Sequence, residues 1–127
     1  MIYGVGTDLI EIKRVARVLE RFGDRFARRI LCEPELKRFR AHKQPVAYLA
    51  KRFAAKEAFT KALGTGIRAP ANWHGVWVEN LRSGKPVLRF TPELDKLLKQ
   101  KNVHAAHLSL TDEREMASAT VILECGG

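Results

Sequence analysis

The sequence predicts an α+β fold in which a mainly antiparallel sheet packs against one long central helix and several shorter helices. Residues 45–63 consist mostly of strong helix formers, begin at Pro45 and are followed by Gly64, a pattern typical of a helix with a left-handed stop. Residues 2–10 have the composition of a strand. Residues 76–90 and 104–124 each contain two strand-like segments around a short polar turn, which predicts two antiparallel hairpins.

Length and charge limit the class of protein. A chain of 127 residues with 46% hydrophobic residues is long enough for one domain, residues 1–127, with a core of its own. It contains 23 Lys and Arg but only 14 Asp and Glu, which gives a formal net charge of +9. This excess predicts a polyanionic partner: nucleic acid, a phosphorylated small molecule, an acidic protein or an anionic membrane surface.

The cysteines and the hydropathy pattern indicate a cytoplasmic protein. Cys32 and Cys125 lie far apart without the spacing of a zinc site or a disulfide scaffold, which fits a reducing compartment. The chain does not open with a basic segment followed by an apolar one, and no apolar run approaches about 18 residues. We therefore expect neither secretion nor a membrane span.

The first predicted strand carries a close-approach signal. Gly4 and Gly6 alternate along it, which indicates that another backbone or a ligand comes near one of its faces. Asp8 lies in step with both glycines and therefore on the same face. A plain alternative is that Asp8 only caps the helix that follows. The Gly-x-Gly segment is too short to indicate a dinucleotide site, because Leu9 stands where a third glycine would be needed.

Residues 11–22 are predicted to form an amphipathic helix that ends at Gly23. Its buried stripe is expected to comprise Ile12, Val15, Leu19 and Phe22. Six arginines follow one another within residues 14–29: Arg14, Arg17, Arg21, Arg25, Arg28 and Arg29. Most basic runs are only solvated faces, but arginine favours bidentate contacts with carboxylates and phosphates. We therefore expect a docking surface for an acidic partner here.

The central helix carries a charge that needs a partner. Two short helices, residues 24–31 and 34–40, precede it. Within the central helix, Glu57 shares a stripe with Phe53, and the opposite side is apolar as well, so the helix should be mostly buried. A buried carboxylate is costly unless it is paired or binds a metal. The simple alternative is an ordinary ion pair with Lys61, four residues on.

A polar row and a glycine loop complete the candidate features. His107, Ser109 and Thr111 alternate with apolar residues on a predicted strand, so they share one face and could form a polar cleft wall. After the central helix, residues 64–68 read Gly-Thr-Gly-Ile-Arg, which could offer backbone amides and a guanidinium to a phosphate or merely cap the helix.

In order and spacing, these segments resemble the holo-acyl-carrier-protein synthase family, the small bacterial 4′-phosphopantetheinyl transferases. The resemblance rests on Gly-Val-Gly-Thr-Asp at 4–8, Arg-Phe-Ala-Ala-Lys-Glu-Ala at 52–58, Gly-Thr-Gly-Ile-Arg at 64–68, Gly-Lys-Pro at 84–86 and His-Leu-Ser-Leu-Thr at 107–111. It covers nearly the whole chain. It implies transfer of the phosphopantetheine arm of coenzyme A to a serine of an acyl carrier protein in fatty acid biosynthesis, with adenosine 3′,5′-bisphosphate as by-product.

The resemblance also implies roles for individual residues. Asp8 and Glu57 would hold a Mg²⁺ ion, and Lys61 would lie near the pyrophosphate. The general base is left open between Glu57, a metal-bound water near Asp8, and His107. The residues implied for coenzyme A are Arg52, Lys61, Gly64, Gly66, Pro86, His107, Ser109 and Thr111.

The carrier protein and the assembly are implied in the same way. Arg14, Arg21, Arg25 and Arg28 match the basic surface on which the family docks its acidic carrier, in agreement with the charge argument. The family forms trimers with the coenzyme between subunits, so His107 could reach Asp8 and Glu57 across an interface. One departure is Asp112-Glu113, where relatives often have a histidine whose contact cannot be carried over.

Two alternatives remain. A small basic nucleic-acid-binding domain would explain the charge, but it needs exposed aromatic side chains among the arginines. We expect Tyr3, Phe22, Phe26 and Phe39 to be buried, and that reading leaves Glu57 unexplained. The other alternative is the same transfer onto a peptidyl carrier protein.

Overall fold

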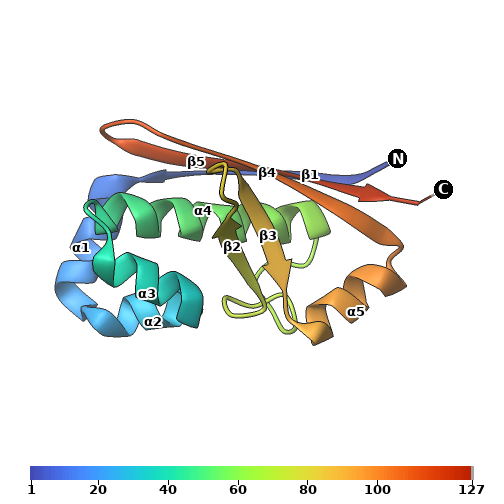
Figure 1. Cartoon of the computed structure of the whole chain (residues 1–127), viewed down its shortest axis with the longest axis horizontal. Helices are drawn as coiled ribbons and strands as arrows, with labels where there is room; N and C mark the ends of the chain where they lie inside the picture. Colours follow the sequence, from blue (N-terminus) through green and yellow to red (C-terminus); the bar gives the residue numbers. More distant parts are fainter. Residues whose placement is uncertain (127) are drawn as a thin grey trace.

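A computed structural model describes residues 1–126 and contains five helices and five strands (Figure 1). In chain order the elements are β1 (Ile2–Glu11), α1 (Ile12–Phe22), α2 (Asp24–Ile30), α3 (Glu33–Ala41), α4 (Pro45–Leu63), β2 (Val76–Asn80), β3 (Pro86–Phe90), α5 (Pro92–Gln100), β4 (Val103–Asp112) and β5 (Met116–Cys125). The predicted α+β class is confirmed, and each predicted element is present to within one or two residues. No helix among the described residues is long and apolar enough to cross a membrane.

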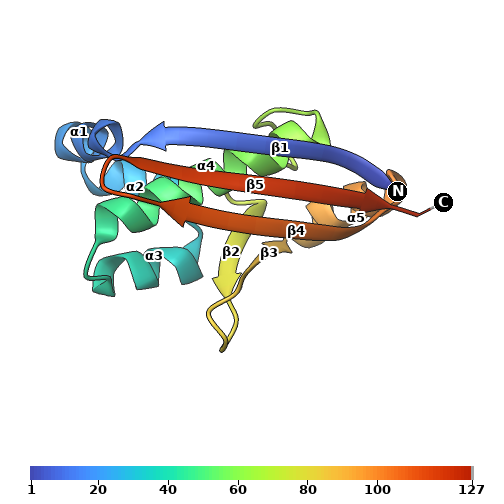
Figure 2. The same cartoon turned by 90° about the horizontal axis from the view of Figure 1, so that it is seen from above.

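The strands form two antiparallel sheets. The larger has the order β1-β5-β4, with both termini of the chain at one end (Figure 2). The smaller is the β2–β3 hairpin, which lies beside the β4 edge. As a result, β1 and β4 are opposite edges of the large sheet, and residues on them are separated by the width of β5.

Helix α4 runs along one face of the large sheet, and the remaining helices lie on that same side (Figure 1). The approach of α4 to β1 is very close. A Cβ atom built on Gly4 would lie 2.0 Å from the carbonyl oxygen of Ala62, and one on Gly6 would lie 1.9 Å from that of Ala58. Only glycine fits at these two positions, as the alternating pattern predicted.

The core is divided into two clusters on either side of α4. One packs α4, the hairpin and α5 against β5, with Phe59, Leu94 and Leu123 among its fully buried side chains. The other packs α4 against the α1–α3 layer, with Ile30 and Leu49 fully buried. Because both flanks of α4 are buried, the expected burial of this helix is confirmed.

Two expected core aromatics are instead exposed. Phe22, at the end of α1, is 50% exposed, with the Arg21 guanidinium 5.2 Å from its ring centroid. Tyr3 is 36% exposed, because it points to the face of the sheet that no helix covers. In contrast, Phe26 and Phe39 pack against the second core cluster, as predicted.

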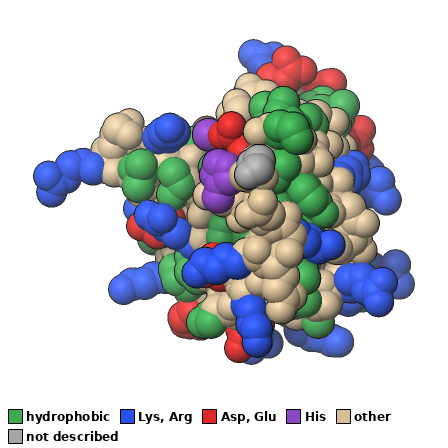
Figure 3. Space-filling view, turned by 90° about the vertical axis from the view of Figure 1, so that its right-hand side faces the viewer, with side chains coloured by type: hydrophobic (Ala, Val, Ile, Leu, Met, Phe, Trp, Pro, Cys, Tyr) green, Lys and Arg blue, Asp and Glu red, His purple; other side chains and the backbone are tan. Residues whose placement is uncertain are grey.

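The outer face of the large sheet is uncovered and partly apolar. Val5 and Leu9 of β1 are large exposed hydrophobic side chains on this face, and the exposed residues His107, Ser109 and Thr111 of β4 lie on the same face across β5. The His107 Nε2 atom contacts the Glu124 carboxylate of β5. At the end of the molecule where the chain ends lie, histidine and acidic side chains adjoin one another, and basic side chains project around much of the outline (Figure 3).

Candidate active site

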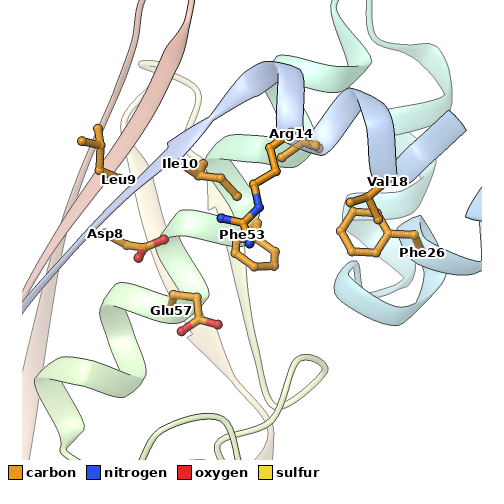
Figure 4. Close-up of a pocket in the computed structure, with 9 residues that line it drawn as sticks. Asp8, Leu9, Ile10, Arg14, Val18, Phe26, Phe53 and Glu57 are labelled. Carbon is orange, nitrogen blue, oxygen red and sulfur yellow. The ribbon is translucent and has the colours of Figure 1, made fainter. Parts of the chain in front are cut away.

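Asp8 and Glu57 line the same cavity, which has a volume of about 380 Å³ (Figure 4). Asp8 comes from the second half of β1 and Glu57 from the fourth turn of α4. Both carboxylates point into the space between strand and helix. Two acidic side chains far apart in sequence are therefore brought to one site, as expected.

The close packing of β1 on α4 fixes where Asp8 lies. Asp8 is paired with Ala119 of β5 in the middle of the sheet and has the same facing as Gly4 and Gly6, toward α4. The N-cap residue of α1 is Glu11, three residues further on. The alternative that Asp8 is only a helix cap is therefore wrong.

Lys61 pairs with Asp8 and not with Glu57. Its Nζ atom lies 3.0 Å from Asp8 Oδ1 and 3.0 Å from the carbonyl oxygen of Thr7. The i, i+4 pair with Glu57, the simple alternative from the sequence, is not formed. Lys61 instead neutralises Asp8.

Glu57 is consequently an unpaired carboxylate. Burial raises its pKa above the usual range, the neighbouring Asp8 charge raises it further, and Lys61 acts in the opposite direction. An anion in this position lacks a cation of its own. The arrangement favours either protonation of Glu57 or the binding of a cation between the two carboxylates.

The rest of the cavity is apolar with one arginine. Val18, Phe26 and Phe53 form its wall, and the Arg14 side chain extends over Phe53 toward the carboxylates (Figure 4). The sequence pattern identified Phe53 as a neighbour of Glu57 on α4 but did not identify Val18 and Phe26, because no spacing rule links helices that meet only in the tertiary structure.

The donor set fits a hard divalent cation that keeps open positions. Among residues 1–126 there is no group of three or more His, Cys, Asp and Glu side chains that could enclose a metal ion. Two carboxylate oxygens that line a cavity suit Mg²⁺ nonetheless, because Mg²⁺ usually binds through one or two carboxylates together with water and substrate phosphates.

A second pocket, of about 470 Å³, lies at the other side of the molecule around Arg52. Arg52 is only 3% exposed, its Nη2 atom donates to Asn80 Oδ1 at 2.6 Å, and its guanidinium lies 4.0 Å from the ring centroid of Tyr48. The Arg52 Nε atom is buried without a hydrogen-bond partner among the described residues. Burial lowers the pKa of Arg52 from its usual range. Other cations line the pocket, namely Arg38, Lys51 and Arg82.

This pocket is built to receive an anion. A desolvated guanidinium with an orphaned N–H, surrounded by further cations, is unfavourable unless a negatively charged group compensates it. The sequence identified Arg52 through the family motif only. Arg38 and Arg82 were missed, because α3 and the β2–β3 loop reach the pocket through folding and carry no spacing signal.

Three further residues predicted to bind coenzyme A, namely Gly64, Gly66 and Pro86, do not lie in one pocket. Gly64 ends α4 with a left-handed conformation (φ 87°), and Gly66 also has a positive φ of 67°. Pro86 is the first residue of β3 and follows Gly84, which lines the Arg52 pocket, by two residues. Gly64 borders a different, shallow pocket that also involves Arg68 and Lys101.

Within one chain, the polar row of β4 does not meet the two carboxylates. His107, Ser109 and Thr111 lie on the uncovered face of the sheet, whereas Asp8 faces α4 from the opposite edge strand. The candidate site residues therefore lie in separate places: Asp8, Glu57 and Lys61 at the β1 edge, the Arg52 pocket between α3, α4 and the β2–β3 loop, and the polar row on the uncovered face of β4 at the opposite edge.

The arginine surface borders the first cavity. All six arginines of α1 and α2 are exposed. Arg25 and Arg29 flank a groove of about 340 Å³ whose floor is formed by Val18, Phe22 and Phe26, and two of these residues also line the cavity of Asp8 and Glu57. An acidic partner bound to this surface would therefore lie beside the carboxylates.

Comparison with known proteins agrees with this arrangement. Residues 4–120 match the family described as the 4′-phosphopantetheinyl transferase superfamily, and the chain belongs to that family. A holo-[acyl-carrier-protein] synthase of Nitrosospira multiformis is 49% identical over 124 residues, which cover 98% of this chain and 99% of the relative.

Solved structures give the same result. The crystal structure of holo-[acyl-carrier-protein] synthase from Neisseria meningitidis superimposes with a TM-score of 0.95 at 44% identity, covering 98% of this chain and 99% of that one. The synthase from Bacillus anthracis, solved in complex with CoA (3′,5′-ADP), has a TM-score of 0.83 at 38% identity and covers 99% of each chain.

Proposed function

We propose that this chain is a holo-acyl-carrier-protein synthase. It transfers the 4′-phosphopantetheine group of coenzyme A to a serine of an apo-acyl-carrier protein and releases adenosine 3′,5′-bisphosphate, as its relatives' names and the coenzyme A complex of one neighbour indicate. One structural observation carries the proposal: two carboxylates, of which Glu57 has no ion-pair partner among the described residues, line a cavity directly beside an arginine-rich surface. That arrangement suits a phosphoryl-type transfer onto an acidic protein, and we place it in cytoplasmic fatty acid biosynthesis.

Asp8 and Glu57 are the proposed ligands of Mg²⁺. When bound, the ion would offset charge on the diphosphate of coenzyme A and on the leaving group. Lys61, already 3.0 Å from Asp8, is placed to bind a phosphate oxygen from the same side and to stabilise charge that develops there. The apolar wall formed by Phe26 and Phe53 excludes water and strengthens these electrostatic contacts.

The Arg52 pocket is the proposed site for the nucleotide end of coenzyme A. Its orphaned guanidinium N–H and flanking cations suit a phosphate group, and Gly84 and Pro86 allow close approach of the adenosine. We assign the residues of the glycine loop, Gly64 and Gly66, to the diphosphate end, because that loop directly follows Lys61 on α4.

A second subunit would complete a site whose residues lie at two edges of a sheet. Coenzyme A would touch both residue groups where the β1 edge of one chain meets the β4 edge of another. The uncovered apolar face with Val5 and Leu9 provides a surface for such contact, and we propose a homotrimer with its active sites at the subunit interfaces. In that assembly His107, Ser109 and Thr111 would act on coenzyme A bound to the neighbour's Asp8 and Glu57.

The carrier protein is proposed to dock on Arg14, Arg21, Arg25 and Arg28. These side chains are exposed on α1 and α2, next to the cavity in which the reaction would occur. Opposite charges steer association and fix orientation, so an acidic carrier would be delivered with its serine near the carboxylates.

Mass spectrometry of an apo-acyl-carrier protein incubated with coenzyme A, Mg²⁺ and this protein tests the proposal. We expect the carrier to gain about 340 Da, the mass of the phosphopantetheine group. An apo-peptidyl carrier protein assayed in parallel tests the alternative acceptor. A carrier that keeps its original mass would refute the transferase function.

A further inference from the structure

A fully buried ion pair lies in the α1–α3 side of the core, outside the site described above. Lys56 is 0% exposed and Glu35 is 1% exposed, and Lys56 Nζ lies 2.6 Å from Glu35 Oε1. Neither side chain lines the cavity of Asp8 and Glu57 or the Arg52 pocket. A buried pair of this kind is often no more stabilising than apolar residues of the same volume, so stability alone explains it poorly.

All three ammonium protons of Lys56 have acceptors. Besides Glu35, Nζ donates to the carbonyl oxygen of Ile30 at 2.6 Å and to that of Trp73 at 2.7 Å. These acceptors belong to α3, to the C-terminal end of α2 and to the loop before β2. One side chain of α4 thus holds three other segments at once.

The carboxylate of Glu35 also accepts hydrogen bonds from two backbone N–H groups. Oε1 accepts the backbone N–H of Cys32 at 2.9 Å, and Oε2 accepts that of Val78 at 2.9 Å. Burial raises the pKa of the adjacent Cys32 thiol to about 11, so Cys32 adds no second negative charge. The hydrogen bond from α3 to β2 therefore does not depend on Lys56, whereas the hydrogen bond from α4 to the end of α2 is made by Lys56 itself.

The end of α2 receives a second donor. His74 Nε2 lies 2.8 Å from the carbonyl oxygen of Arg28, the distance of an imidazole N–H donating to it. The carbonyl groups at this helix end lack intrahelical partners, and cationic or N–H donors are favourable there. Lys56 and His74 together hold α2 by its C-terminal carbonyl groups.

Lys56 and His74 hold the proposed docking surface in place through α2. Helix α2 carries Arg25 and Arg28, and its Phe26 lines both the groove and the catalytic cavity. A rotation or shift of this short helix would move the docking arginines and the cavity wall together.

Lys56 is also connected to the proposed catalytic carboxylate of Glu57. Lys56 directly precedes Glu57 on α4. Trp73, whose carbonyl oxygen Lys56 binds, packs its ring 5.0 Å from that of Phe53, which lines the cavity beside Glu57. The same hydrogen bonds thus fix the cavity wall from both sides.

We propose that Lys56, assisted by His74, is a positioning residue that holds the carrier-docking helix α2 in register with Glu57, so that a docked carrier presents its serine to the metal site. The inference rests on the proposed transferase function. It assigns Lys56 no contact with substrate; it acts only through α2, Trp73 and Glu57.

The test compares Lys56→Met with a destabilised control. Methionine keeps the stem of the side chain and removes the three donated hydrogen bonds. We expect the KM for apo-acyl-carrier protein to rise and kcat to fall, with kcat/KM lower by about tenfold or more, because a small displacement of docked reactants is costly. The KM for coenzyme A should stay within about twofold, since none of the hydrogen-bond partners of the Lys56 side chain lines the Arg52 pocket.

Leu98→Ala is the matched control. Leu98 is buried in the other core cluster, so its truncation should lower Tm without touching α2. Assayed well below both melting temperatures, Leu98→Ala should keep the wild-type KM for the carrier. Equal carrier KM values for Lys56→Met and Leu98→Ala would show that Lys56 is only a structural residue and would overturn the proposal.

His74→Ala keeps the test decisive if Lys56→Met does not fold. His74 is exposed, so the variant should fold, and we expect its carrier KM to rise about two- to fivefold with the coenzyme A KM unchanged. A wild-type carrier KM in His74→Ala would overturn the proposal. These outcomes differ from failure of the proposed function, in which the wild-type protein itself would not modify any carrier.

Discussion

The carboxylate of Glu57 lowers the stability of the metal-free protein, yet the proposed activity needs it. It is partly buried against Phe53 and faces the charge of Asp8, while the nearest cation, Lys61, is bound to Asp8. Its pKa is therefore raised, which means that ionisation of Glu57 costs free energy in the folded, metal-free protein. A ligand for the proposed Mg²⁺ is thus maintained at the expense of the stability of the metal-free state.

Glu57→Gln should stabilise the metal-free protein while it abolishes transfer. The wild-type pKa is raised by folding, so ionisation of Glu57 opposes folding at neutral pH and this penalty disappears as the pH falls below the pKa of the unfolded chain. Thermal melts in EDTA should give a higher Tm for the variant at pH 7 to 8, and the difference should vanish in acid. Added Mg²⁺ should raise the Tm of the wild type but not of the variant.

Glu79→Gln is the control for this charge change. Glu79 forms an exposed pair with Arg89, and exposed pairs contribute little. Its melts should follow the wild type with and without Mg²⁺. A Glu57→Gln protein that is less stable than the wild type at pH 8 would contradict the assigned environment of Glu57.

At the level of elements, the contact of β1 with α4 determines the geometry of the site. Gly4 and Gly6 let the strand approach the helix backbone directly, and Asp8 follows two residues later on the same face. The distance from Asp8 to Glu57 thus depends on two positions that have no side chain.

Gly6→Ala should displace Asp8 without altering any functional group. The added Cβ would lie 1.9 Å from the Ala58 carbonyl oxygen, so the strand has to move away from α4, at a cost of about 1–3 kcal/mol or more. We expect a lower denaturant midpoint and a rise in the Mg²⁺ concentration needed for half-maximal transfer. Thr7→Ala, on the uncovered face, should cost less than about 1 kcal/mol and leave the Mg²⁺ dependence unchanged.

The α1–α2 surface is the second element that carries a prediction. Arg21→Glu combined with Arg25→Glu should lower kcat/KM for the carrier by about tenfold or more and leave the KM for coenzyme A unchanged, because we propose that only the carrier docks on this face. The loss should shrink at high salt. Lys96→Glu with Lys99→Glu on α5 makes the same change in net charge; an equal loss in that variant would show that docking depends on overall charge and not on this surface.

At the level of the whole molecule, the separation of the candidate residues onto opposite sheet edges is the main result. The proposed metal group, Asp8 and Glu57, lies at β1, and the proposed nucleotide group, the Arg52 pocket, lies at the β2–β3 hairpin beside the β4 edge. In the proposed mechanism coenzyme A reaches both groups across a subunit interface, and assembly becomes part of that mechanism.

Mixing two inactive variants tests this division. Asp8→Asn removes the metal group and Arg52→Gln removes the nucleotide group, so each protein alone should be inactive. In randomly mixed trimers with each site shared by two neighbours, about a quarter of the sites contain both intact groups. Co-refolded protein should therefore recover about a quarter of the wild-type activity. No recovery from well-mixed trimers would place the whole site within one subunit.

Local pattern alone was sufficient for the helices, the strands and several site residues. The termination of α4 at Gly64, the shared face of Gly4, Gly6 and Asp8, and the need of Glu57 for a partner all follow from neighbours within a few residues, where helix and strand periodicity operates. Contacts between distant segments followed from none of these rules. Only the tertiary structure paired Lys61 with Asp8, buried Arg52 among cations from α3 and the hairpin, exposed Phe22 and joined Lys56 to the end of α2. Periodicity fixes which face of an element a side chain occupies, whereas its partner across the chain depends on how the faces pack.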